Sequence, residues 1–95
     1  MVVWVVQSVP YGVMLNYANT SIEGVFNTFK KAQERALEIV KRDIKFNNYK
    51  VNKYEFDNFE NHFKIYEDIS IDVFADKDEN YNEYYTLSII SKVVE

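Results

Sequence analysis

The sequence predicts an α+β domain in which one helix packs on a mainly antiparallel sheet of four or five strands. Two patterns carry this prediction. From Phe63 to Ala75, apolar and polar residues alternate, as in a long strand with one buried and one exposed face. From Thr28 to Lys45, apolar residues recur every three or four positions, as in an amphipathic helix. The predicted order of elements is β-β-α-β-β-β, with the helix laid across one face of the sheet.

Residues 2–9 are predicted to form the first strand. Its apolar side chains fall on both faces, with Val2, Trp4 and Val6 on one and Val3, Val5 and Val9 on the other. A strand that is apolar on both sides is typical of the centre of a sheet. Pro10-Tyr11-Gly12 is expected to end it, and a long loop follows. Ile22 to Phe26 is then predicted to form a second strand that pairs antiparallel with the first.

The predicted helix carries one apolar stripe, made of Phe29, Ala32, Ala36, Val40 and Ile44. Asn27 or Thr28 offers the N-cap side chain. Asn47-Asn48 is a plausible stop signal, because asparagine tolerates the left-handed backbone that ends helices.

Three strands are predicted after the helix. Lys50 to Phe56 alternates weakly, with Tyr54 and Phe56 as inward candidates, and residues 57–62 are expected to form a polar connector. The long strand of residues 63–75 follows. A loop then leads to the last strand, Glu83 to Val94, in which Tyr85, Leu87, Ile89 and Val93 share a face.

Length and composition bound the class of protein. The 95 residues fit one domain, residues 1–95. The absence of cysteine excludes disulfides and thiolate metal sites and suits a reducing compartment, so we expect a cytoplasmic location, in the host cytoplasm if the protein is viral. No stretch reaches the roughly 20 apolar residues that cross a bilayer, so no membrane partner is expected. The apolar N-terminal run lacks a basic leader and a cleavage site, so no signal peptide is expected.

The start of the chain carries a resemblance. The first strand is rich in valine, Gly24-Val25-Phe26 comes after it, and Thr28-Phe29-Lys30-Lys31-Ala32 lies at the helix start. On these features, about the first 45 residues resemble small uncharacterised proteins of bacteriophages and bacteria. The resemblance implies a compact α+β fold and a viral or mobile-element origin, and it brings no activity and no site residue. Ten Asn, nine Lys and eight Tyr against two Arg are also typical of an AT-rich genome.

No catalytic residue, metal or cofactor is predicted. His62 is the only histidine, and there is no nucleophile elbow, glycine-rich phosphate loop or His-Glu-x-x-His motif. The segment of residues 76–83 is rich in oxygen ligands, but an EF-hand loop needs Gly at its sixth position and Glu at its twelfth. Counted from Asp76, this chain has Tyr81 and Leu87 there. The sequence therefore favours a non-enzymatic function.

Protein binding is the predicted function. Aromatic residues make up 17% of the chain, and tyrosine is enriched at interfaces. The predicted partner-binding site combines the tyrosines of the last hairpin with two rim charges: Tyr81, Tyr84, Tyr85, Asp76 and Asp78. A homo-oligomer, with a dimer favoured, is expected because one helix cannot cover both faces of the sheet. It would form through the uncovered face or a sheet edge, and the loop from Pro10 to Ser21 is an equally good cover for that face within the chain. The identity of any other protein partner is left open.

Small-ligand binding and nucleic-acid binding are the two other functions on which the sequence bears. A small ligand between the first loop, the helix and the sheet is the alternative, with Tyr11, Asn16 and Tyr17 as its polar contacts. Nucleic-acid binding is not expected. Residues 1–48 hold six basic and four acidic residues, whereas the aromatic-rich remainder holds five basic and eleven acidic ones. Single-strand binders instead combine aromatic side chains with a basic groove.

Overall fold

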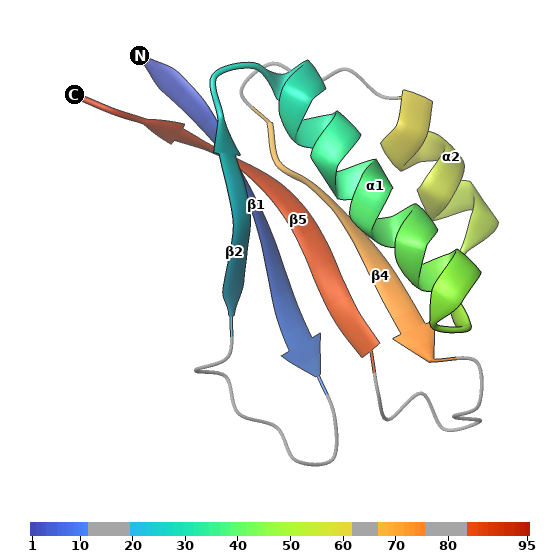
Figure 1. Ribbon diagram of the computed structural model, residues 1–95. Helices are drawn as coiled ribbons and strands as arrows, with labels where there is room; N and C mark the ends of the chain where they lie inside the picture. Colours follow the sequence, from blue (N-terminus) through green and yellow to red (C-terminus); the bar gives the residue numbers. More distant parts are fainter. Residues whose placement is uncertain (12–19, 62–66, 76–83) are drawn as a thin grey trace.

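Strands β1 (Val2–Tyr11) and β5 (Tyr84–Val93) form the centre of a five-stranded sheet (Figure 1). The computed structural model describes residues 1–11, 20–61, 67–75 and 84–95. The strand order is β2-β1-β5-β4-β3, and every neighbouring pair is antiparallel. Strand β2 (Ser21–Phe26) forms one edge, while β4 (Ile69–Ala75) and the short β3 (Tyr49–Val51) lie on the other side of β5. The predicted α+β fold with a mainly antiparallel sheet is confirmed.

Helices α1 (Phe29–Phe46) and α2 (Lys53–Asn61) lie on the same face of the sheet (Figure 1). Their apolar sides and the facing strand residues form one core. The core side chains that are buried are Val6, Phe29, Ala32, Ala36, Ile39, Val40, Phe59, Ile71, Val73, Leu87 and Ile89. The predicted alternation in the last two strands is confirmed, because Ile71, Val73, Leu87 and Ile89 face the helices.

Helix α1 begins and ends close to its predicted limits. The Thr28 side chain accepts a hydrogen bond from the Lys31 N–H at 3.2 Å, so Thr28 is the N-cap. At the other end, Asn48 has a φ of 57°, in the left-handed region, and Asn47 is the C-cap. The buried stripe is rotated from the predicted one, since Ile39 is 3% exposed while Ile44 is 39% exposed.

The segment after α1 differs most from the prediction. Strand β3 has only three residues, and the rest of the predicted strand and connector forms helix α2. The Asn52 side chain accepts from the Glu55 N–H at 3.1 Å and so caps this helix. Phe56 and Phe59, three residues apart, then turn toward the core. The predicted third strand is therefore confirmed at Lys50 and Val51, and it is wrong from Lys53 onward, because a cap and a helical spacing outweigh a weak alternation.

Two strand limits also differ. Strand β1 continues through Pro10 to Tyr11, and Pro10 lies opposite Tyr85 in the sheet. Strand β4 begins at Ile69, with Glu67 and Asp68 outside it, so the described part of the predicted long strand is shorter than expected. Phe63 and Ile65 lie outside the described residues.

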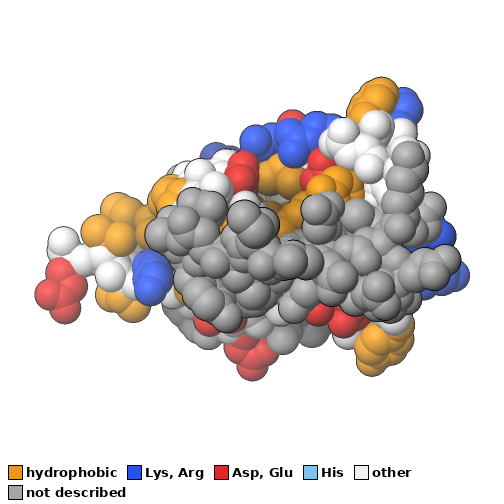
Figure 2. All heavy atoms as spheres, turned by 90° about the horizontal axis from the view of Figure 1, so that it is seen from below, with side chains coloured by type: hydrophobic (Ala, Val, Ile, Leu, Met, Phe, Trp, Pro, Cys, Tyr) orange, Lys and Arg blue, Asp and Glu red, His pale blue; other side chains and the backbone are white. Residues whose placement is uncertain are grey.

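The outer side of α1 is basic. Lys41, Arg42 and Lys45 are exposed there, near the end of the helix. Figure 2, which views the molecule from below, shows Lys and Arg side chains gathered along the helix side. The charge asymmetry of the sequence thus reappears in the fold as a basic helix surface.

Candidate functional site

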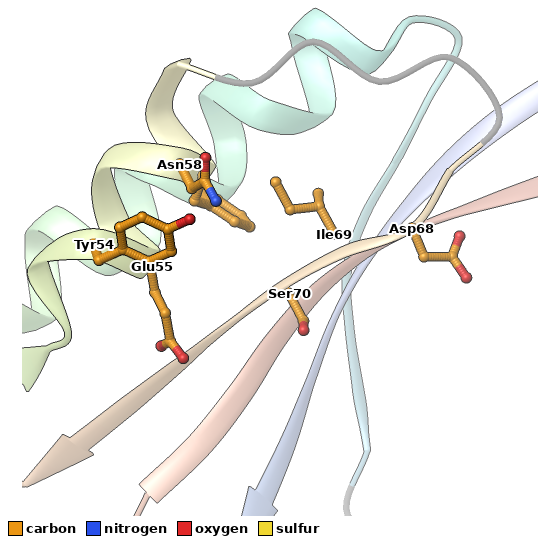
Figure 3. A pocket seen from close by; sticks show the side chains of 7 residues that line it. Tyr54, Glu55, Asn58, Asp68, Ile69 and Ser70 are labelled. Carbon is orange, nitrogen blue, oxygen red and sulfur yellow. The ribbon is translucent and has the colours of Figure 1, made fainter.

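A cavity of about 340 Å³ lies between α2 and the start of β4 (Figure 3). It is lined by Tyr54, Glu55, Asn58 and Phe59 of α2 and by Asp68, Ile69 and Ser70. Phe59 and Ile69 give it an apolar wall, while Tyr54 is 76% exposed at its mouth. Its charged lining residues, Glu55 and Asp68, are both acidic. The cavity, which we call the α2–β4 cleft, therefore combines an apolar wall with negative charge.

Helix α2 is held in place by contacts with α1. The Gln33 side chain, 5% exposed, donates hydrogen bonds to the backbone carbonyls of Phe59 at 2.8 Å and Glu60 at 3.0 Å. These carbonyls belong to the last turn of α2, where no further turn of helix can bond them. An ion pair between Lys41 and Glu60, 3.0 Å apart, joins the same two helices at the surface. The helix wall of the cleft is thus fixed by a buried polar contact.

The opposite face of the sheet carries no helix among the described residues. In β1 the even-numbered Val6 is fully buried under the helices, so the odd-numbered Val3, Val5 and Val9 point to the other face. Val5 lies between Val25 of β2 and Ile90 of β5 in a cross-strand row. Ile22, which lies opposite Gln7, extends the apolar area, and Ile22 and Val25 are both 59% exposed. Apart from Gln7, this open face is apolar along β2 and β1 and at Ile90 of β5.

The other part of the open face is polar. Ser88 and Thr86 of β5 lie beside Ser70 and Asp72 of β4. The Thr86 hydroxyl donates to the Asp72 carboxylate at 2.6 Å. The open face therefore has an apolar half and a polar half.

Tyr85, one of the predicted partner-binding residues, points to the helix side. Its hydroxyl donates a hydrogen bond to the carboxylate of Asp43, a buried residue of α1, and its ring meets that of Tyr49 edge-on with centroids 5.8 Å apart. Asn47 donates to the same carboxylate at 2.8 Å. Burial, and then the hydrogen bond and negative charge of Asp43, raise the pKa of Tyr85 far above its usual 10.0. Tyr85 thus links α1 to the sheet.

The other predicted site residues lie mostly outside the described residues. Asp76, Asp78 and Tyr81 are outside them, as are Asn16 and Tyr17 of the alternative ligand site and His62. Tyr84 and Tyr11 are the end residues of β5 and β1 and lie opposite each other in the sheet. The roles assigned to both sets stay predictions.

The sequence prediction missed the α2–β4 cleft altogether. Tyr54, Asn58 and Phe59 come from a segment that it assigned to a strand and a connector. Asn52 followed by Glu55, with Phe56 and Phe59 three apart, was the signal that indicates a capped helix there.

The described ranges hold neither a metal-ligand cluster nor a membrane-spanning helix. Within them, no three His, Cys, Asp or Glu side chains group closely enough to hold a metal ion. No helix in the same ranges combines the length and apolar character that crossing a bilayer requires.

A family model, described as a domain of unknown function (DUF7336), matches residues 1–65, more than half of the 95-residue chain. The chain belongs to this family. The resemblance to small uncharacterised proteins is confirmed to this extent, as membership of an uncharacterised domain family. The DUF7336 match includes β1, β2, α1, β3 and α2 and ends before β4 and β5 begin. Searches of curated proteins and of solved structures found no match.

The end of the DUF7336 match has a structural meaning. Strand β5 lies between β1 and β4, and β4 lies between β5 and β3. The two strands beyond the match are therefore the ones that join β3 to β1 in the sheet. The α2–β4 cleft takes one wall from within the DUF7336 match and the other from outside it.

Proposed function

We propose that this protein is a non-enzymatic protein-binding domain that forms a dimer through the open face of its sheet. The observation that carries the proposal is the apolar half of that face, centred on the row of Val25, Val5 and Ile90. Apolar surface that the described residues leave uncovered is a candidate interaction site in a folded protein. A second copy of the chain is the proposed occupant, because two-fold symmetry lets one apolar surface cover another of the same shape.

The size of the apolar half limits the strength of the dimer. Strands β1 and β5 have ten residues each and β2 has six. At about 3.3 Å per residue and about 4.8 Å between strands, the three cover on the order of 400 Å² per copy. Sheet-on-sheet contact would then bury on the order of 800 Å² in total, as in weak or transient interfaces, so the dimer is expected to depend on protein concentration.

Lysine at the exposed positions Ile22 and Val25 is expected to convert the dimer into a monomer. Both residues are 59% exposed, so the I22K/V25K double variant should keep the fold while placing charge within the apolar half of the open face. The measurement is the mass in solution by light scattering and by native mass spectrometry. Phe46, 69% exposed at the end of α1 and away from this face, supplies the control substitution F46K, which should leave the dimer intact.

Three outcomes of that measurement bear on the proposal. A mass of two chains for the wild type and for F46K, with one chain for I22K/V25K, supports it. A wild type that is monomeric at every concentration up to the solubility limit contradicts it. A monomer that retains a small molecule in the native spectrum favours the alternative function, small-ligand binding.

The biological setting that we propose follows from the composition. The Asn-, Lys- and Tyr-rich chain supports an origin in an AT-rich phage or viral genome. An accessory or inhibitory factor acting in the host cytoplasm is the role that suits a small binding domain of this origin.

A further inference from the structure

The outer edge of β4 is covered by a strand over only part of its length. Strand β3 pairs with β4 from Val73 to Ala75, whereas β5 pairs with it from Ile69 onward. After Val51 the chain leaves the sheet and forms α2. Among the described residues, the outer edge of β4 from Ile69 to Ile71 therefore has no neighbouring strand.

The hydrogen-bonding pattern shows which backbone groups point to this edge. Met1 and Val94 exchange backbone hydrogen bonds, at 2.8 Å and 3.3 Å, so the even-numbered residues of β5 bond β1 and the odd-numbered ones face β4. Ile89 and Leu87 lie opposite Ile69 and Ile71, which are thus the residues of β4 that bond β5. Ser70, between them, directs its N–H and C=O outward.

Helix α2 stands beside this open edge and forms the second wall of a groove. Tyr54 and Asn58 lie on the α2 side of the cleft, and Ile69 lies across from them (Figure 3). A groove between a helix and an unpaired strand edge is the arrangement that receives an added strand in peptide-binding domains. Unpaired edges otherwise invite uncontrolled pairing, so a lasting open edge calls for an explanation.

We infer that the α2–β4 cleft binds an extended, basic segment of a partner protein, which adds to the outer edge of β4 as a further strand. Its backbone bonds the N–H and C=O of Ser70. Its side chains alternate in direction. Those on the helix side contact Phe59, Ile69 and Tyr54, and those on the opposite side lie near Asp68 and Asp72. A segment in which apolar residues alternate with Lys or Arg therefore fits both sides.

Charge selects this occupant over a second copy of the chain. Glu55 and Asp68 line the cleft, and Asp72 follows along the same strand, whereas no Lys or Arg is among the described lining residues. Two copies paired edge to edge would bring these acidic groups together, and like charges on adjacent strands destabilise pairing. A basic segment replaces that repulsion by attraction. This binding surface lies at the outer edge of β4, apart from the apolar half of the open face, so the two proposals can fail separately.

The probes are peptides of about seven residues in which apolar residues and Lys alternate. Two versions are used, one that begins with an apolar residue and one that begins with Lys. Val/Glu peptides of the same pattern are the charge control. Binding to the full chain is followed by amide chemical shifts in NMR titrations. The expected result is that at least one Lys peptide shifts the amides of Ser70 and α2 and protects the Ser70 N–H from hydrogen exchange. Binding should weaken with salt, and the Glu peptides should not bind.

Proline at position 70 tests the backbone contact directly. Because the Ser70 N–H makes no bond to β5, Ser70→Pro removes the outward donor without breaking that ladder. We expect affinity to fall roughly threefold to tenfold, as the loss of one hydrogen bond implies. Ser70→Ala is the matched control and should bind like the wild type, because the Ser70 side chain points away from α2 (Figure 3).

Charge variants provide a second test that does not alter the backbone. Asp68→Asn with Asp72→Asn should weaken binding roughly threefold to tenfold and reduce its salt dependence. Glu38→Gln, on the exposed side of α1, should have no effect. If no Lys peptide shifts Ser70, if Ser70→Pro binds as well as Ser70→Ala, or if Glu peptides bind equally, the inference is wrong. A monomeric wild type would overturn the dimer proposal and leave this one intact.

Discussion

Replacing Phe59 by alanine is expected to lower the free energy of unfolding by about 3–5 kcal/mol. Phe59 is 1% exposed and is the buried residue of α2, where it packs into the same core as α1 and the central strands. Its replacement by alanine removes a large apolar side chain from the core and leaves a cavity behind. Urea unfolding measures the change, and the fluorescence of Trp4, the single tryptophan, reports the transition because it packs against the core.

The control for Phe59 is another phenylalanine near a helix end. Phe46 is 69% exposed, so Phe46→Ala should change the free energy of unfolding by no more than about 0.5 kcal/mol. Hydrogen exchange adds a local readout, since α2 should lose protection in F59A before the central strands do. Equal stabilities of F59A and F46A would mean that α2 is not anchored through Phe59.

Replacing Tyr85 by phenylalanine is expected to lower the free energy of unfolding by about 1–3 kcal/mol. The change removes one hydroxyl and leaves the buried Asp43 carboxylate with one donor fewer. Tyr54→Phe is the matched control, because that tyrosine is 76% exposed and its loss of a hydroxyl should be nearly neutral. The double variant with Asp43→Asn completes a thermodynamic cycle. A coupling energy near zero in that cycle would contradict the assigned link between α1 and β5.

The same link predicts how stability depends on pH. The pKa of Tyr85 is raised in the folded protein, mainly by burial and then by Asp43, above the unfolded value of 10.0. The contribution of the protonated hydroxyl to the free energy of unfolding is therefore complete below pH 10. It decreases as the pH rises further, because the unfolded chain then releases this proton while the folded chain still holds it. Unfolding of wild type and Y85F at about pH 9 and about pH 11 measures it, and the stability difference between them should shrink at the higher pH.

Regular patterns made α1 and the sheet predictable from the sequence. Helix α1 keeps its stripe over 18 residues, with Thr28 as the cap and Asn47-Asn48 as the stop. The alternation through Ile71 and Val73 fixed the face of β4 correctly, since a shift of one residue would have exposed every apolar side chain. Long periodic segments leave few alternatives of similar energy.

Short elements were not predictable by the same means. Strand β3 has three residues and α2 has nine, too few for either period to stand out. Tyr54 and Phe56 alternate as in a strand, yet Tyr54 is exposed and Phe56 packs on the core from a helix. The α2–β4 cleft depends on this short helix and on the chain leaving the sheet after Val51. The capping pair Asn52 and Glu55 could have indicated the helix, but the approach of α2 to β4, which forms the cleft, could not be inferred from the sequence.

Tyrosine content alone could not separate a contact surface from internal packing. Tyr85 was grouped with its neighbours near the last hairpin, whereas its ring packs on Tyr49 and its hydroxyl bonds Asp43, 42 positions away. The partner is a buried acidic residue on a helix, and a local pattern holds no information on such a distant contact.

The pairing of β1 with β5 has a consequence for the order of folding. These two strands form the middle of the sheet, yet Val2 pairs with Val93 and Tyr11 with Tyr84. Closing such distant contacts carries a large entropy loss before any strand bond is gained, which slows folding relative to helical proteins of equal length. A nascent chain that has not reached residue 84 presents the inner edges of both β1 and β4 without their shared neighbour. The sheet can therefore close only after the chain has reached β5, the strand that lies between β1 and β4.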